Sequence, residues 1–195
     1  MRLGGTSRKQ SILVIDNFLT ENENNQIIQY YKSNDFIGEP LEDKTVIPVY
    51  FSGREKHRLI DRMIDACFFD SYDGYEFWFN NPTTPIGFHF DTDQALEHKT
   101  GEIRHPSLSL VYYPDVNING GGGGLVIKDH AIIEAKKGRL VAFDSTLQHG
   151  VSDFIGTRLS LVVNIWKQKP LGIEAISQKV CYENQSKESV SSQQF

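Results

Sequence analysis

The second half of the chain is a series of short extended segments separated by turn signals. The segments are rich in β-branched and aromatic residues and cover 75–80, 86–90, 107–113, 125–127, 131–134, 139–143 and 158–166. The joints between them contain Gly, Pro or Asn: Asn81-Pro82, Pro114-Asp115, Gly120–Gly124, Lys137-Gly138 and Gly156. Many short strands at this spacing favour a sandwich or a jelly roll.

Two amphipathic helices are predicted before this series. Thr20 and Glu23 form a capping box, and the helix that follows should end near Ser33-Asn34. Ser52 and Glu55 form a second capping box ahead of a helix with one apolar stripe. The stripe is interpreted as core and consists of Leu59, Ile60, Met63, Ile64, Cys67 and Phe68.

The order of these elements predicts an α+β fold that is mainly β, with the N-terminal helices packed on one sheet. Two further strands are expected over 11–15 and 45–51. At 195 residues the chain can form one domain with a substantial core. We place this domain at 11–170, after a flexible start at 1–10 and before a polar tail at 171–195.

Composition narrows the class of protein further. The chain is 39% hydrophobic and 23% charged, which is ordinary for a globular protein. A net charge of −5 disfavours a nucleic-acid partner, and no apolar run reaches the roughly 18 residues that span a bilayer. Cys67 and Cys181 form no motif, which indicates a reduced setting. We therefore expect a soluble, cytoplasmic protein without a membrane partner.

The segment Gly87–Asp91 carries the clearest candidate chemistry. Residues i and i+2 of a strand leave the same face, so His89 and Asp91 can converge on one point. A second imidazole would complete two histidines and one carboxylate, the facial arrangement of non-haem Fe(II) sites. His149, which follows an apolar strand ending at Phe143, is the candidate for this imidazole.

Arg158 stands at the head of a strong strand whose flanks alternate toward a buried interior. A buried guanidinium needs a partner and binds a carboxylate in bidentate fashion. Ser160 leaves the same face and can donate its hydroxyl to that carboxylate. An iron site beside a dicarboxylate co-substrate explains the triad and this cation together, whereas a structural ion pair with Asp144 or Asp153 is the alternative.

These segments together resemble the prolyl-4-hydroxylase-like branch of the Fe(II)/2-oxoglutarate oxygenases. The resemblance covers roughly residues 11 to 168 and is specific in its combination of motifs. In chain order the matching segments are 15–20, His89-x-Asp91, Tyr112-Tyr113, the glycine run, 138–143, 149–151 and 156–161. Departures are the segment Trp78–Pro82, in place of a tyrosine-and-glycine pattern, and five glycines in place of two.

The resemblance implies a double-stranded β-helix, a jelly-roll or cupin-like fold, with Fe(II) held by His89, Asp91 and His149. It implies that 2-oxoglutarate chelates this metal and pairs its far carboxylate with Arg158, assisted by Ser160 and by the Tyr113 hydroxyl. The implied activity is that of an O2-dependent dioxygenase. Such a hydroxylase oxidises a C–H bond of a protein residue or small metabolite and releases succinate and CO2. The primary substrate stays unidentified.

Other interpretations stay open from sequence alone. His89 and Asp91 can form a hydrogen-bonded pair within a strand. A zinc or iron hydrolase or isomerase on a cupin-like scaffold also uses such a triad, and a binding module can keep the fold without the chemistry. Asp93 is expected to be a solvated carboxylate and His105 a surface or loop residue. Gly120–Gly124 is expected to form a flexible loop near the pocket mouth.

Overall fold

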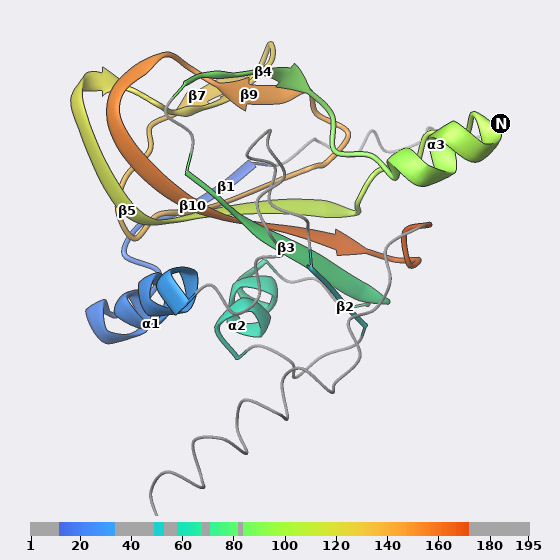
Figure 1. Ribbon diagram of the computed structural model, residues 1–195, viewed down its shortest axis with the longest axis horizontal. Coiled ribbons are helices and arrows are strands. Elements are labelled where there is room, and N and C mark those ends of the chain that lie inside the picture. The colour runs from blue at the N-terminus through green and yellow to red at the C-terminus, as the bar shows by residue number, and fades with distance from the viewer. Residues whose placement is uncertain (1–11, 34–48, 53–57, 68–70, 82–83, 172–195) are drawn as a thin grey trace, which may run out of the picture.

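A computed structural model describes residues 12–33, 49–52, 58–67, 71–81 and 84–171. Two antiparallel sheets lie face to face, and two helices cover the outer side of the larger sheet (Figure 1). The predicted α+β, mainly β, jelly-roll fold is therefore confirmed. The segments predicted as a flexible start and a polar tail lie outside the described residues, except for Leu171.

The larger sheet has six strands, and every neighbouring pair is antiparallel. Its order across the sheet is β1 (Ile12–Ile15), β8 (Leu140–Phe143), β5 (Leu108–Gly122), β10 (Phe154–Trp166), β3 (Gly74–Asn80) and β2 (Val49–Ser52). The long strands β5 and β10 lie at its centre. They bend upward past the smaller sheet and frame one end of the space between the two sheets (Figure 1).

The smaller sheet has four short strands in the order β4 (Ile86–His89), β9 (His149–Val151), β6 (Leu125–Ile127) and β7 (Ala131–Ile133). Because β4 is hydrogen-bonded only to β9 in this sheet, it forms an edge among the described strands. This sheet faces the inner side of β5 and β10, so the two sheets enclose the side chains that point between them.

Side chains of the central strands point alternately to the two faces of the larger sheet, so one set packs against the helices and the other points between the sheets. Leu159, Leu161, Val163 and Ile165 of β10 leave the outer face and pack against the helices. The helices are α1 (Glu21–Ser33) and α2 (Arg58–Ala66), and the core on this face includes Ile27, Leu59, Ile60, Met63 and Ile64. The apolar stripe predicted for α2 is therefore core where the structure describes it. The residues between these outward positions of β10, from Arg158 to Asn164, point between the sheets.

The first capping box forms as predicted. The Thr20 backbone N–H donates to the Glu23 carboxylate over 3.0 Å, and the Glu23 N–H donates to the Thr20 hydroxyl over 3.3 Å. Burial then fixes the helix against the sheet, since Asn24 bonds to two residues of β5. Its amide donates to the Pro114 carbonyl over 3.0 Å, and its oxygen accepts from the Tyr112 hydroxyl over 2.8 Å. The second capping box lies outside the described residues.

Two predicted turns are wrong. Pro114-Asp115 lies inside β5, and Gly156 lies inside β10, because these two strands pair along most of their length. The register shifts between Leu159 and Leu161, so two residues of β5 oppose Ser160. A bulge of this kind accommodates Pro114, which has no N–H to donate to the ladder.

A third helix, α3 (Gln94–Thr100), has no counterpart in the sequence prediction. It connects β4 to β5 and is capped at both ends: Asp93 accepts from the Leu96 N–H, and Gly101 has a left-handed backbone. Asp93 is buried rather than solvated, since its carboxylate also accepts from the Leu171 N–H over 2.8 Å. None of the helices in the described ranges is both long enough and apolar enough to cross a bilayer.

We predict that Asn24→Ala lowers the free energy of unfolding by about 2–3 kcal/mol, because it leaves the Tyr112 hydroxyl and Pro114 carbonyl without their partner. Urea unfolding followed by circular dichroism measures this change. Asn25→Ala is the matched control, since Asn25 is exposed on the same helix and should change stability by less than about 0.5 kcal/mol. Equal losses in the two variants would contradict this assignment.

Candidate metal centre

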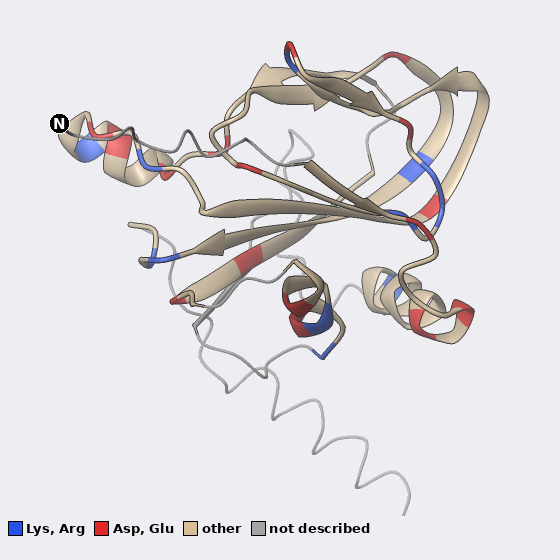
Figure 2. Cartoon of the chain, turned by 180° about the vertical axis from the view of Figure 1, so that it is seen from behind, with Lys and Arg blue, Asp and Glu red and all other residues tan. Residues whose placement is uncertain are grey.

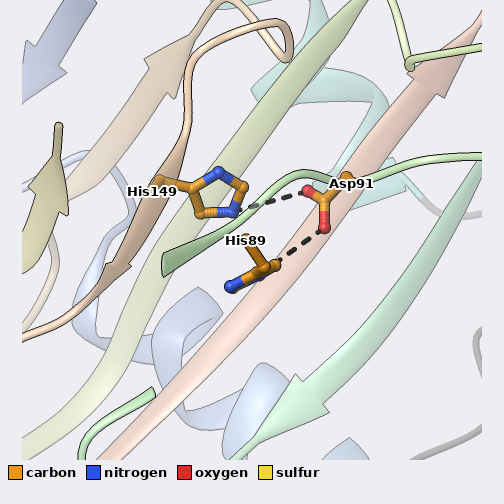
Figure 3. A group of neighbouring side chains, drawn as sticks. All are labelled: His89, Asp91 and His149. Carbon is orange, nitrogen blue, oxygen red and sulfur yellow. Dashed lines mark ion pairs between the residues drawn. The ribbon is translucent and has the colours of Figure 1, made fainter. Parts of the chain in front are cut away.

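The smaller sheet brings two of the three predicted ligands together. His89 ends β4 and is the register partner of His149 at the start of β9. Their ring centroids lie 4.4 Å apart. Asp91 follows β4 by two residues and turns its carboxylate toward both rings (Figure 3). Residues that are 60 positions apart in the chain thus converge because two short strands pair.

The three side chains are close without being bonded to one another. Nε2 of His89 lies 3.9 Å from Oδ1 of Asp91, and Nε2 of His149 lies 3.7 Å from Oδ2. These separations exceed hydrogen-bond range, so the alternative of a hydrogen-bonded His89–Asp91 pair is not what the structure contains. One nitrogen or oxygen from each residue lies within 4.8 Å of the others, which is the arrangement that a shared ion requires.

Backbone carbonyls fix the tautomer of both histidines. Nδ1 of His89 lies 2.9 Å from the Gly87 carbonyl, and Nδ1 of His149 lies 3.2 Å from the Leu147 carbonyl. A carbonyl only accepts, so Nδ1 carries the proton and the Nε2 lone pair faces Asp91. Burial lowers the pKa of His149, against the opposing effect of Asp91, and this favours the neutral ring that binds metals.

Arg158 is buried between the sheets without a carboxylate partner. Its two terminal nitrogens donate to the Gly123 carbonyl over 2.7 Å and to the Ser160 hydroxyl over 3.1 Å. Within the described part of the chain no carboxylate forms an ion pair with it, so the predicted alternative of a pair with Asp144 or Asp153 is wrong. Its Nε is buried and lacks any hydrogen-bond partner there.

Tyr113 lies beside this guanidinium. The Arg158 Cζ atom is 5.1 Å from the centre of the Tyr113 ring, within the range of a cation–π contact. Burial raises the pKa of the Tyr113 hydroxyl, which has no hydrogen-bond partner among the described residues. The Arg158 Nε–H and the Tyr113 hydroxyl are thus two buried donors without a partner among the described residues. A bound carboxylate fits this arrangement, since an unpaired buried donor otherwise costs about 1–3 kcal/mol. The Ser160 proton goes to the Asn80 carbonyl over 3.2 Å.

One cavity joins the triad to Arg158. It has a volume of about 100 Å³, and His89, Asp91, His149, Arg158 and Asn80 line its polar parts. Its apolar walls are Trp78, Ile86, Val111, Leu125, Phe143, Val151 and Val162. Trp78, at the start of the segment that departs from the family pattern, lines the cavity. The site has the form expected of an ion and a small anion bound side by side.

A further group of buried polar residues was missed from the sequence. Glu76, Asn164, Ser109 and Ser145 are linked by hydrogen bonds between the sheets. Burial raises the pKa of Glu76 to about 7, although the Asn164 amide that donates to it lowers the pKa. Strand register brings these residues together, and no local spacing signals it. His105 lies in the loop between α3 and β5, as predicted, and is half-buried with Nδ1 3.0 Å from the Asp91 carbonyl.

Comparison with known proteins relates part of the chain to a known superfamily. Residues 77–166 match the model of the 2OG-Fe(II) oxygenase superfamily, and this stretch contains the whole triad and Arg158. No curated protein sequence matches the chain. This match agrees with the resemblance that the sequence predicted. The predicted use of Fe(II), 2-oxoglutarate and O2 is confirmed with it.

Solved structures share the fold at low sequence identity. A viral collagen prolyl hydroxylase from Paramecium Bursaria Chlorella virus-1, in complex with 2OG, is 17% identical with a TM-score of 0.57 and covers 85% of this chain and 100% of its own. A Pseudomonas putida prolyl-4-hydroxylase is 16% identical with a TM-score of 0.55, covering 83% and 90%. HygX from Streptomyces hygroscopicus, with nickel and 2-oxoglutarate bound, is 11% identical with a TM-score of 0.53, covering 82% and 84%.

We predict that the stability contributed by Glu76 falls as pH rises. Its folded pKa of about 7 lies above the ordinary 4.5, so the folded state holds the proton more tightly than the unfolded state does. The contribution is complete below pH 4.5 and is lost between pH 4.5 and about 7. Relative to Glu76→Gln, the wild type should therefore lose about 3 kcal/mol of unfolding free energy between pH 4.5 and 8.

Urea unfolding of both proteins at several pH values measures this difference. Glu102→Gln, at an exposed glutamate, is the matched control and should follow the wild type throughout. A constant offset between wild type and Glu76→Gln across this range would show that the Glu76 pKa is not raised.

Proposed function

We propose that the protein is an Fe(II)- and 2-oxoglutarate-dependent hydroxylase whose metal is held by His89, Asp91 and His149. The observation that carries the proposal is the pairing of this triad with an unpartnered, buried Arg158 in one cavity. A zinc hydrolase would use the triad, but it gives no role to a buried guanidinium whose carboxylate partner is missing among the described residues. An anion such as 2-oxoglutarate supplies that partner.

The proposed roles follow from the contacts of each side chain. The two neutral imidazoles offer Nε2, and Asp91 adds one negative charge, which leaves positions on the ion open to other ligands. Gly123 and Ser160 hold the Arg158 fork in place, so little entropy is lost when a carboxylate binds to it. The Tyr113 hydroxyl is the second donor proposed for this carboxylate. The apolar walls of the cavity keep water from the reacting atoms.

When bound, the iron and 2-oxoglutarate supply the oxidising chemistry, which the protein contains and directs. The balanced reaction is R–H + O2 + 2-oxoglutarate → R–OH + succinate + CO2. One oxygen atom enters the new hydroxyl group and the other enters succinate. The protein's own contribution is to bind 2-oxoglutarate and the primary substrate and to exclude water.

We propose a polypeptide side chain as the primary substrate. His89 is 43% exposed at its side chain, whereas His149 is 8% exposed, so the centre opens to solvent on the β4 side. Phe88 and Phe90 precede and follow His89 in the chain and are 52% and 44% exposed, so apolar surface lies exposed along this segment. A Trichoplax adhaerens prolyl hydroxylase of similar fold, with a TM-score of 0.51 and 15% identity, was solved with a peptide fragment.

The first test is an anaerobic titration of metal-free protein with Fe(II) and 2-oxoglutarate, followed by visible absorbance. We expect a weak charge-transfer band that needs both additions and is lost in His149→Ala, with metal affinity reduced more than about 100-fold. His98→Ala, at an exposed histidine of α3, is the control and should keep the band. A band that persists in His149→Ala would overturn the proposed ligand set.

The second test concerns the co-substrate. We expect Arg158→Gln to raise the KM for 2-oxoglutarate by roughly 30- to 1,000-fold, because truncating one partner of a buried charge pair costs about 2–4 kcal/mol. Succinate release at varied 2-oxoglutarate concentration measures this. Arg62→Gln removes an arginine that pairs with Glu23 on the helix side and should leave the KM unchanged. An unchanged KM in Arg158→Gln would contradict the proposed role.

A further inference from the structure

A row of buried polar side chains crosses three central strands of the larger sheet. Asn164 on β10 is the register partner of Glu76 on β3 and of Ser109 on β5. The three are 1%, 6% and 0% exposed. The Asn164 amide donates to the Glu76 carboxylate over 3.3 Å, and the Ser109 hydroxyl donates to the Asn164 oxygen over 2.7 Å. The row is thus a continuous chain of hydrogen bonds.

One end of this row reaches the candidate metal centre. Ser109 Oγ lies 3.3 Å from Oδ2 of Asp91 and 2.7 Å from the Asn164 oxygen, so its single proton is shared between these two acceptors in a three-centre hydrogen bond. Among the described residues, Ser109 has the side chain that forms a hydrogen bond with the Asp91 carboxylate. Ser145 Oγ lies 2.9 Å from Ser109 Oγ, and no hydrogen bond connects Ser145 to Asp91. Ser109 is therefore the single link between the row and the triad.

The Ser109 hydroxyl is held on several sides. The Asn164 oxygen accepts from it, Ser145 Oγ lies 2.9 Å from its oxygen, and the Glu76 carboxylate in turn accepts from the Asn164 amide. Each of these groups is buried, so none can exchange its bond for one to bulk water. A carboxylate that is hydrogen-bonded to such a rigid group has one preferred orientation, which lowers the entropy lost when an ion binds.

The free-energy cost of burying this polar row also indicates that the row has a function. Burying a glutamate, an asparagine and two serines between sheets is more expensive than filling the space with apolar side chains. Val111 and Val162, on the same inner face, show that apolar residues fit there. Nothing in the fold requires polar residues at this place, whereas a metal-binding carboxylate does benefit from a fixed hydrogen-bond donor.

We propose that Ser109 is a positioning residue for the metal centre, and that the row of Asn164 and Glu76 holds it in place. Ser109 fixes the Asp91 carboxylate with Oδ2 toward His149 and Oδ1 toward His89. This role rests on the proposed function, because it requires that Asp91 binds a metal ion. It assigns Ser109 no contact with substrate or co-substrate.

The test is a titration of metal-free protein with Co(II) alone, followed by the visible bands of the bound ion. We expect Ser109→Ala to weaken Co(II) affinity about 10-fold and to change the bands, because Asp91 loses its fixed orientation. Ser145→Ala is the matched control, since it removes a buried hydroxyl from the same cluster without removing a bond to Asp91. It should bind Co(II) within about twofold of the wild type.

Two further measurements complete the test. Urea unfolding confirms that both serine variants are folded, and the KM for 2-oxoglutarate at saturating iron should be unchanged in Ser109→Ala, since Arg158 is untouched. Equal Co(II) affinity in wild type and Ser109→Ala, or equal losses in both serine variants, would overturn the positioning role alone. Absence of Co(II) binding by the wild type would overturn the metal-site proposal and the positioning role together.

Discussion

The site depends on the antiparallel pairing of β4 with β9. This pairing sets His89 opposite His149, and a slip of one residue would turn one ring to the other face of the sheet. The pairing is short, so the rest of the fold has to maintain it. The larger sheet does so because its inner face closes the space below both histidines, while its outer face is anchored by the helices. The candidate site thus lies on one face of the larger sheet, and the helix-packed core lies on the other.

The space between the sheets holds several buried polar side chains beside an apolar cluster that includes Val111, Leu125 and Phe143. Arg158 lies toward one end and Glu76 toward the other, whereas the side chains that pack on the helices are almost all apolar. Charged residues elsewhere lie mainly on helices and loops, with both signs interspersed (Figure 2). A folded chain tolerates a few expensive buried groups where an apolar core of sufficient size compensates for them. The helix-side core therefore makes the polar interior possible.

The sequence predicted the features that depend on local spacing. The capping box at Thr20, the stripe of α2 and the strand that carries His89 follow from residues within a few positions of one another. Features that depend on the register between distant strands could not be predicted from the sequence. Examples are the hydrogen-bonded row from Glu76 to Asp91 and the bulge that accommodates Pro114. Asp93 illustrates the same limit, because its burial depends on α3, on the Leu171 N–H and on the Arg104 side chain, which lies 3.7 Å from its carboxylate.

The glycine run has a structural role that its flexibility would not suggest. Gly120 to Gly123 have positive φ, and the first three end β5 rather than forming a loop. A side chain at Gly122 would collide with the Asp153 carbonyl, and one at Gly123 would approach Ile118 and Phe154 too closely. Because both positions are glycine, the backbone passes close to the start of β10 and presents the Gly123 carbonyl to Arg158. The run therefore helps to orient the guanidinium that lines the cavity.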